Sequence, residues 1–156
     1  MNSSFYEIVS RALSRESKHL LAYTDALDAD PQAKQAQIAE YKCAKYRYAA
    51  ISNVHAPLVQ SNRLSGNLAD THYVIKPFYE ALLGRPELLA EYERAADKPC
   101  AGLYFGAVAF AEQKIAEFED NLSHATDWEA IEPAERLGGY RFALECLHEG
   151  WKEAAK

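Results

Sequence analysis

The stretch from residue 31 to residue 55 constrains the fold most, because it carries two apolar stripes at helical spacing. With about 100° of rotation per residue, one stripe lies on a single helix face and comprises Tyr41, Ala44, Tyr48, Ile51 and His55. A second stripe, on a different face, comprises Cys43, Tyr46, Ala50 and Val54. A helix that is apolar on two sides packs between two neighbours. We therefore predict a central, two-sided helix over about residues 31–55.

The same helical period recurs along the rest of the chain. Three rows spaced by helix turns are Leu13, Leu20 and Leu27; Val108, Ala111, Ile115, Phe118 and Leu122; and Leu137, Leu144 and Trp151. With 156 residues, only 7 Gly and 6 Pro, the chain has the size of one domain and a composition that favours helix. We predict an all-α, compact bundle of five or six helices forming a single domain over residues 1–156.

Two local patterns add detail to this bundle. Gly102 and Gly106 are four residues apart, so they share a helix face and would let another helix approach closely. The run from Thr126 to Glu129 has the spacing of a capping box, in which a hydroxyl and a carboxylate cap one helix reciprocally. We expect close packing at the glycines and a capped helix start after Thr126.

The charge of the chain is concentrated in one third of its length. The whole sequence has a formal net charge of −6, but residues 87–135 alone carry twelve Asp or Glu and three Lys or Arg, a net charge of −9. This distribution disfavours direct nucleic-acid binding and favours a partner with a basic surface. Our leading hypothesis is a non-enzymatic protein-binding or regulatory module, such as an inhibitor, an adaptor or an immunity-type protein. The predicted partner-binding residues are Glu87, Glu91, Glu93, Glu112, Glu117, Glu119, Asp120, Asp127 and Glu129.

A metal-binding protein is the alternative hypothesis, based on two Glu-x-x-His spacings. These are Glu16 with His19 and Glu145 with His148. A carboxylate and an imidazole three residues apart on a helix point the same way, as in four-helix di-iron or di-manganese proteins. Glu16 also falls on a row of the first helix that is otherwise core-facing. If these two pairs converge, the expected cofactor is a di-metal centre; otherwise we expect none.

A third hypothesis, a binder of nucleotide or nucleic acid, rests on a basic and aromatic stretch inside the predicted central helix. Lys42, Lys45, Tyr46 and Arg47 could neutralise phosphates and stack on a base. Their helical phases differ, however, so the four side chains cannot form one flat patch.

Cysteine usage and hydropathy bear on the location of the protein. The three cysteines, Cys43, Cys100 and Cys146, are odd in number and widely spaced, which fits a reducing compartment. We find neither a signal-peptide pattern at the N-terminus nor an apolar run of the ~18 residues that cross a bilayer. We expect a cytoplasmic protein with no membrane partner, and the sequence leaves self-association open. No Ser or Cys has recognisable catalytic spacing to a histidine, so we nominate no catalytic residue.

Overall fold

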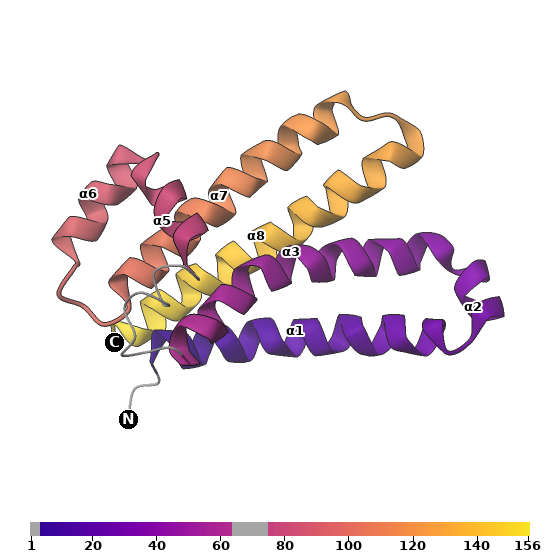
Figure 1. Ribbon diagram of the computed structural model, residues 1–156, viewed down its shortest axis with the longest axis horizontal. Coiled ribbons are helices and arrows are strands. Elements are labelled where there is room, and N and C mark those ends of the chain that lie inside the picture. Colours follow the sequence, from indigo (N-terminus) through magenta and orange to yellow (C-terminus); the bar gives the residue numbers. More distant parts are fainter. Residues whose placement is uncertain (1–3, 64–74) are drawn as a thin grey trace.

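The computed structural model describes residues 4–63 and 75–156, and all regular elements in these ranges are helical (Figure 1). They are α1 (Phe5–Asp28), α2 (Pro31–Ala36), α3 (Ile38–Arg63), α5 (Lys76–Leu83), α6 (Pro86–Arg94), α7 (Ala101–His124), the one-turn 3-10 helix η1 (Asp127–Ala130) and α8 (Ile131–Ala154). The predicted all-α bundle is confirmed. In the described ranges, no helix combines the length and apolar character needed to cross a membrane.

The four long helices form two antiparallel hairpins. α1 pairs with α3, and α7 pairs with α8, while α8 also packs against α1 and α3. α5 lies on α7, and α6 contacts α5 and α7. The hairpins lie together near the chain termini and diverge toward α2 and η1 (Figure 1). We call the end with the termini the proximal end and the end with α2 and η1 the distal end.

The prediction that the central helix packs on two sides is confirmed for α3. Its first stripe faces α1, where the Tyr41 hydroxyl donates a 2.8 Å hydrogen bond to Asp28. Its second stripe faces α8, where Ala50 lies against Gly139. α3 packs most extensively on α8 and α1, so its two apolar faces fill two separate interfaces.

The boundaries predicted for this helix, about residues 31–55, were wrong at both ends. The chain leaves helical geometry at Gln37, whose φ is −119° and ψ 32°, and this break separates α2 from α3. The Gln37 side chain accepts a 3.1 Å hydrogen bond from the Tyr23 hydroxyl of α1, a tertiary contact that helical spacing does not reveal. At the other end, α3 runs past Pro57 to Arg63. The buried Val54 and Leu58 on either side of Pro57 hold that segment against the core.

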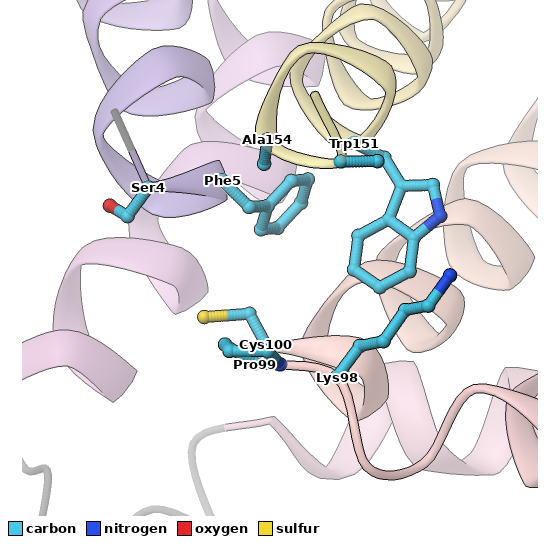
Figure 2. Close-up of a pocket in the computed structure, with 8 residues that line it drawn as sticks. Ser4, Phe5, Lys98, Pro99, Cys100, Trp151 and Ala154 are labelled. Carbon is cyan, nitrogen blue, oxygen red and sulfur yellow. The ribbon is translucent and has the colours of Figure 1, made fainter. Parts of the chain in front are cut away.

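Aromatic rings from three helices fill the core at the proximal end. The Tyr104 and Trp151 rings stack with centroids 4.4 Å apart, and Phe5 meets the Tyr104 ring edge-on at 5.5 Å. Figure 2 shows Phe5 on α1 and Trp151 on α8, both facing the start of α7 at Cys100. Such edge and offset ring contacts add to the burial of apolar area. They join α1, α7 and α8 where the two hairpins meet.

The prediction of close packing at Gly102 and Gly106 is confirmed at Gly106 only. A Cβ atom at Gly106 would lie 3.0 Å from the Cβ of Phe78 on α5. A Cβ atom at Gly102 would lie 3.6 Å from the hydroxyl oxygens of Tyr79 and Tyr92. Gly106 therefore lets α5 lie close to α7, whereas the contacts at Gly102 are of ordinary van der Waals length and would accommodate a Cβ atom.

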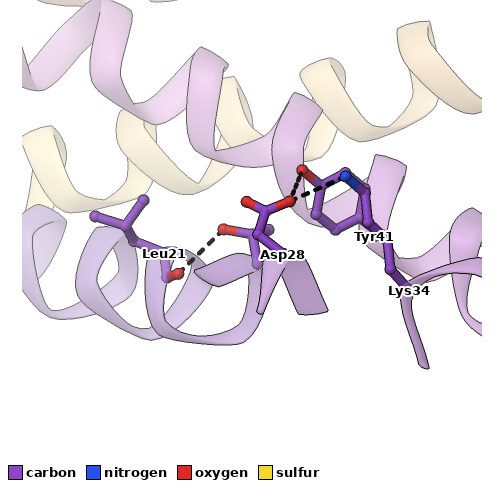
Figure 3. Close-up of polar contacts among 5 residues, drawn as sticks. Leu21, Asp28, Lys34 and Tyr41 are labelled. Carbon is purple, nitrogen blue, oxygen red and sulfur yellow. Dashed lines mark hydrogen bonds and ion pairs between the residues drawn. The ribbon is translucent and has the colours of Figure 1, made fainter. Parts of the chain in front are cut away.

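A polar cluster ties α1, α2 and α3 together at the distal end. Asp28 accepts hydrogen bonds from the Tyr41 hydroxyl at 2.8 Å and from Lys34 Nζ at 3.0 Å (Figure 3). The Lys34 ammonium also lies 4.5 Å from the centroid of the Tyr41 ring. These contacts fix the end of α1 relative to the start of α3, although the apolar core is thin there.

Candidate functional site

A crevice of about 440 Å³ opens at the distal end, between the start of α3 and the η1–α8 segment. Its lining combines apolar, aromatic and charged side chains from both hairpins. The lining residues are Ile38, Ala39, Lys42 and Tyr46 on one side and Trp128, Glu129, Ile131 and Glu132 on the other. The residues that line the crevice come from the distal end, where the two hairpins diverge (Figure 1).

The chain between α7 and α8 holds Trp128 out toward solvent. Thr126 is extended, with φ −126° and ψ 146°, and Asp127 has a left-handed φ of 50°. Asp is one of the few residues that tolerate this region. The turn leaves the Trp128 side chain 76% exposed, the largest exposed apolar side chain among the described residues.

The capping box predicted over Thr126–Glu129 was wrong. No side-chain hydrogen bond caps η1 at Thr126, and α8 begins at Ile131. In a capping box, the chain enters a regular helix directly after the cap residue. Here Thr126 is extended and the next residue, Asp127, has a left-handed φ, so the chain does not enter a helix in that way.

The wall of the crevice is braced by Arg136 of α8. Its guanidinium lies 5.4 Å from the centroid of the Tyr46 ring, and its Nε donates a 3.0 Å hydrogen bond to Glu132. A cation over an aromatic face attracts the ring electrostatically. Arg136 therefore neutralises Glu132 and holds Tyr46 in place. Among the described residues, the lining charges Lys42 and Glu129 and the neighbouring Asp127 are in no ion pair.

Several of the predicted partner-binding carboxylates are already paired within the chain. The ion pairs are Glu87 and Glu112 with Arg85, Glu117 with Lys114, and Glu119 with Arg141. Asp120 lies 3.9 Å from Nδ1 of His124, a contact that is ionic only when the histidine is protonated. Pairing lowers the field that these carboxylates project toward a partner.

The remaining predicted carboxylates fall into two separate sets. Glu91 and Glu93 lie on α6, and Asp127 and Glu129 lie in η1; all four are exposed and have no ion pair in the described ranges. α6 lies beside the start of α7, whereas η1 follows its end (Figure 1). The 24 residues of α7 span roughly 36 Å at 1.5 Å per residue. The acidic third of the sequence is therefore not one continuous surface.

The basic stretch of α3 is dispersed, as its helical phases predicted. Lys42 and Tyr46 reach the distal crevice. Lys45 lies 5.5 Å from the centroid of the Tyr41 ring, on the α1 side. Arg47 turns toward α1, where its Nε is 3.8 Å from Glu16. The four residues proposed to hold an anion thus face three directions.

The two Glu-x-x-His pairs do not form a metal-binding group. Glu16 is half-buried beside Arg47, whereas His19, Glu145 and His148 are exposed. His148 Nδ1 is hydrogen-bonded to the Tyr104 hydroxyl at 3.0 Å. Across the described residues, no three or more His, Cys, Asp or Glu side chains are grouped to hold a metal ion. We therefore propose no metal centre at these residues.

His55 forms a hydrogen bond between helices. Its Nε2 lies 3.1 Å from the Ser10 hydroxyl oxygen of α1. Burial lowers the pKa of His55, which favours the neutral imidazole at neutral pH. Among the described residues, no carboxylate is bonded to the ring, so the pair lacks the third group that orients the base in a Ser–His nucleophilic site.

Sequence reasoning missed Trp128 as a site residue. The signal was present, since a tryptophan stands between Asp127 and Glu129 in a short polar connection. The sequence pattern around this tryptophan was interpreted as a helix cap. The exposure of the Trp128 ring became evident only from the geometry of the turn.

Comparisons of the chain with protein-family models, curated proteins and solved structures found no match. Function is therefore inferred from the geometry and charge of the distal crevice.

Proposed function

We propose that this chain is a non-enzymatic protein-binding module that docks a partner with a basic surface at its distal crevice. The observation that carries this proposal is the Trp128 ring, which is 76% exposed beside a crevice lined by Ile38 and Ile131. Tryptophan is enriched among the residues that dominate binding energy at protein interfaces. An exposed ring at the edge of an apolar crevice can be buried by a partner without any rearrangement of the core.

The charges around the crevice specify the chemistry of the partner. Asp127 and Glu129 flank Trp128, and both lack an intramolecular ion pair in the described ranges. Among the described residues that line the crevice, Lys42 is the only cation, and it is in no ion pair. We infer that the partner inserts an apolar side chain between Ile38 and Trp128 and places Lys or Arg residues beside the two carboxylates.

The ion pairs narrow the predicted docking surface. Reversing the charge of Glu117 or Glu119 would break its ion pair with Lys114 or Arg141. A loss of binding in such a variant would then reflect a disturbed fold as well as a lost contact with the partner. Asp127 and Glu129 are in no ion pair in the described ranges, and the left-handed φ of Asp127 is kept if Asn replaces it. We place them at the centre of the proposed interface and the paired carboxylates at its margin.

Fluorescence anisotropy with a defined peptide panel tests the proposal. The probes are short labelled peptides with Leu or Phe flanked by Arg, and matched peptides with Glu in place of Arg. We expect binding of the Arg peptides alone, and weaker binding as salt is raised, because salt screens exposed charges. Trp128→Ala should weaken binding about tenfold or more, as loss of an interface anchor does. The double change Asp127→Asn, Glu129→Gln removes both charges while Asn tolerates the left-handed φ, and it should abolish binding.

The α6 set of carboxylates provides a matched control. Glu91→Gln with Glu93→Gln removes the same number of charges from exposed residues away from the crevice. If both double variants weaken binding equally, the general negative charge of the protein is responsible and the crevice is not the site. Equal binding of the Arg and Glu peptides would refute the basic-partner proposal.

A further inference from the structure

A second cavity, of about 410 Å³, opens at the proximal end among the starts of α1 and α7 and the end of α8. Its walls are mainly apolar and include Phe5, Pro99, Trp151 and Ala154. Figure 2 shows Phe5 and Trp151 on one side of the open space and Pro99 and Cys100 on the other. This volume lies within the range of about 300–1,000 Å³ typical of small-molecule pockets. We call this cavity the proximal pocket.

Two of the polar side chains that line the proximal pocket carry hydrogen-bond donors and no acceptor, whereas the Ser4 hydroxyl accepts from the Glu7 backbone N–H. The Lys98 ammonium and the Trp151 indole nitrogen lie at the rim of the pocket, on the edge of the Trp151 ring that faces away from Phe5 (Figure 2). In the described ranges, neither nitrogen has a hydrogen-bond or ion-pair partner. No acidic side chain is among the described residues that line the pocket. Two unpaired donors beside an apolar wall match a ligand with an anionic group at one end of an apolar body.

The start of α7 adds to this polarity. Cys100 holds a left-handed φ of 64°, one of two such non-glycine residues in the described ranges, and no side chain caps the helix there. The uncapped N–H groups of a first helical turn favour negative charge. Burial raises the pKa of the Cys100 thiol, so the thiol stays protonated at neutral pH and adds no negative charge to the pocket.

We propose that the proximal pocket binds a small carboxylate with an apolar body. Lys98 and the Trp151 indole N–H hold the carboxylate, and the body packs against Phe5, Pro99 and Ala154. This site is independent of the distal crevice, because the two cavities have no lining residue in common and lie at opposite ends of the long helices. The protein would then have a small-molecule site in addition to its proposed protein-binding site.

Tryptophan fluorescence can report on this pocket selectively. The chain has two Trp residues, so Trp128→Phe leaves Trp151 as the sole tryptophan. In that variant we would titrate phenylacetate, with phenylacetamide as its neutral isostere. We expect a saturable fluorescence change and a shift of the Trp151 indole N–H resonance with phenylacetate. The amide should bind about tenfold more weakly, because it lacks a charge-assisted hydrogen bond.

Three further variants, each checked for native helicity by circular dichroism, decide the outcome. Lys98→Met should remove the preference for phenylacetate over its amide, whereas Lys152→Met, with the same charge change outside the lining, should keep it. Ala154→Phe should fill the pocket and abolish binding. The proposal is overturned if phenylacetate does not saturate, if both lysine variants act alike, or if Ala154→Phe still binds. Tighter binding of a peptide with a free C-terminal Phe would assign the pocket to peptide termini instead.

Discussion

At the scale of single residues, Gly139 sets how closely α3 and α8 approach each other. A Cβ atom at this position would lie 2.8 Å from the Cβ of Ala50 and 2.9 Å from the backbone oxygen of Arg47. Neither neighbour is a flexible side-chain end, so the helices would have to move apart. At the adjacent Gly138, the added Cβ would meet only the Arg47 guanidinium, at 2.9 Å, and that group can rotate away.

We therefore predict opposite effects for alanine at these neighbouring glycines. Gly139→Ala should lower the free energy of unfolding by about 1–3 kcal/mol, the usual cost of overpacking a core. Gly138→Ala should be neutral or raise it by up to about 1 kcal/mol, since alanine favours a helix over glycine. Urea denaturation followed by circular dichroism measures both. Equal midpoints for the two variants would contradict the close approach at Gly139.

A second prediction at the residue scale concerns Asp28. The hydrogen bond from Tyr41, and then that from Lys34, lower the pKa of Asp28 below its ordinary value of 3.8. A carboxyl whose folded-state pKa is lowered contributes stability above its unfolded pKa and loses that contribution as pH falls through the folded value. Asp28→Asn should therefore lower the urea midpoint at neutral pH but not in acid well below pH 3.8.

Asp25→Asn is the control for this pH dependence. Asp25 lies three residues before Asp28, near the end of α1. It is exposed and has no ion pair in the described ranges. Its replacement should leave the urea midpoint nearly unchanged at both pH values. An Asp28→Asn deficit that persists in acid would show that the carboxylate charge is not its cause.

At the scale of elements, α6 is attached more weakly than the long helices. None of its residues is buried. Its connections to α7 include the Tyr92 ring, whose centroid is 6.2 Å from that of Phe105, and the Arg85–Glu112 ion pair at its start. Segments with little buried apolar surface open locally at low free-energy cost. The local stability of α6 should therefore be lower than that of α7.

Hydrogen exchange measured by mass spectrometry should show this difference. Amides of Pro86–Arg94 should exchange before those of the buried first half of α7, and Arg85→Met should accelerate α6 further by releasing Glu112. Lys114→Met, which removes a pair within α7 itself, should leave α6 unchanged. Equal protection of α6 and α7 would contradict the weak attachment of α6. If Arg85→Met leaves the exchange of α6 unchanged, the ion pair does not limit its opening.

At the scale of the whole molecule, one core cluster runs through α1, α3, α5, α7 and α8. α8 contacts both members of the first hairpin, so neither hairpin buries its apolar surface without the other. A shared core of this kind favours a single cooperative transition. The single domain over residues 1–156 stays a prediction, and the unfolding experiment below tests it.

Two spectroscopic probes test this cooperativity. In the Trp128→Phe variant, unfolding followed by Trp151 fluorescence at the proximal end should share its urea midpoint with helicity measured over the entire chain. Both signals should then give one unfolding free energy. Separate midpoints would show that the hairpins unfold as independent units.

The candidate site shows the limit of sequence reasoning at this scale. The negative charge of residues 87–135 was evident from the sequence. Its division into a set on α6 and a set in η1 depends on the length and direction of α7. Which carboxylates are free likewise depends on Arg85 and Arg141, because a pairing such as Arg141 with Glu119 joins separate helices. The number of charges in a segment can be counted from the sequence. The position of those charges on the surface depends on how the helices pack.

The sequence alone determined the all-helical class and the two packing faces of α3, because helical spacing places side chains on faces without reference to any other segment. It also indicated the close approach at Gly106. Only the tertiary structure decided the break at Gln37 and the exposed turn at Trp128. It also decided that, among the described residues, the two Glu-x-x-His pairs form no metal-binding group. Each of these depends on which helices meet and at what angle. Such contacts between distant residues have no period along the chain.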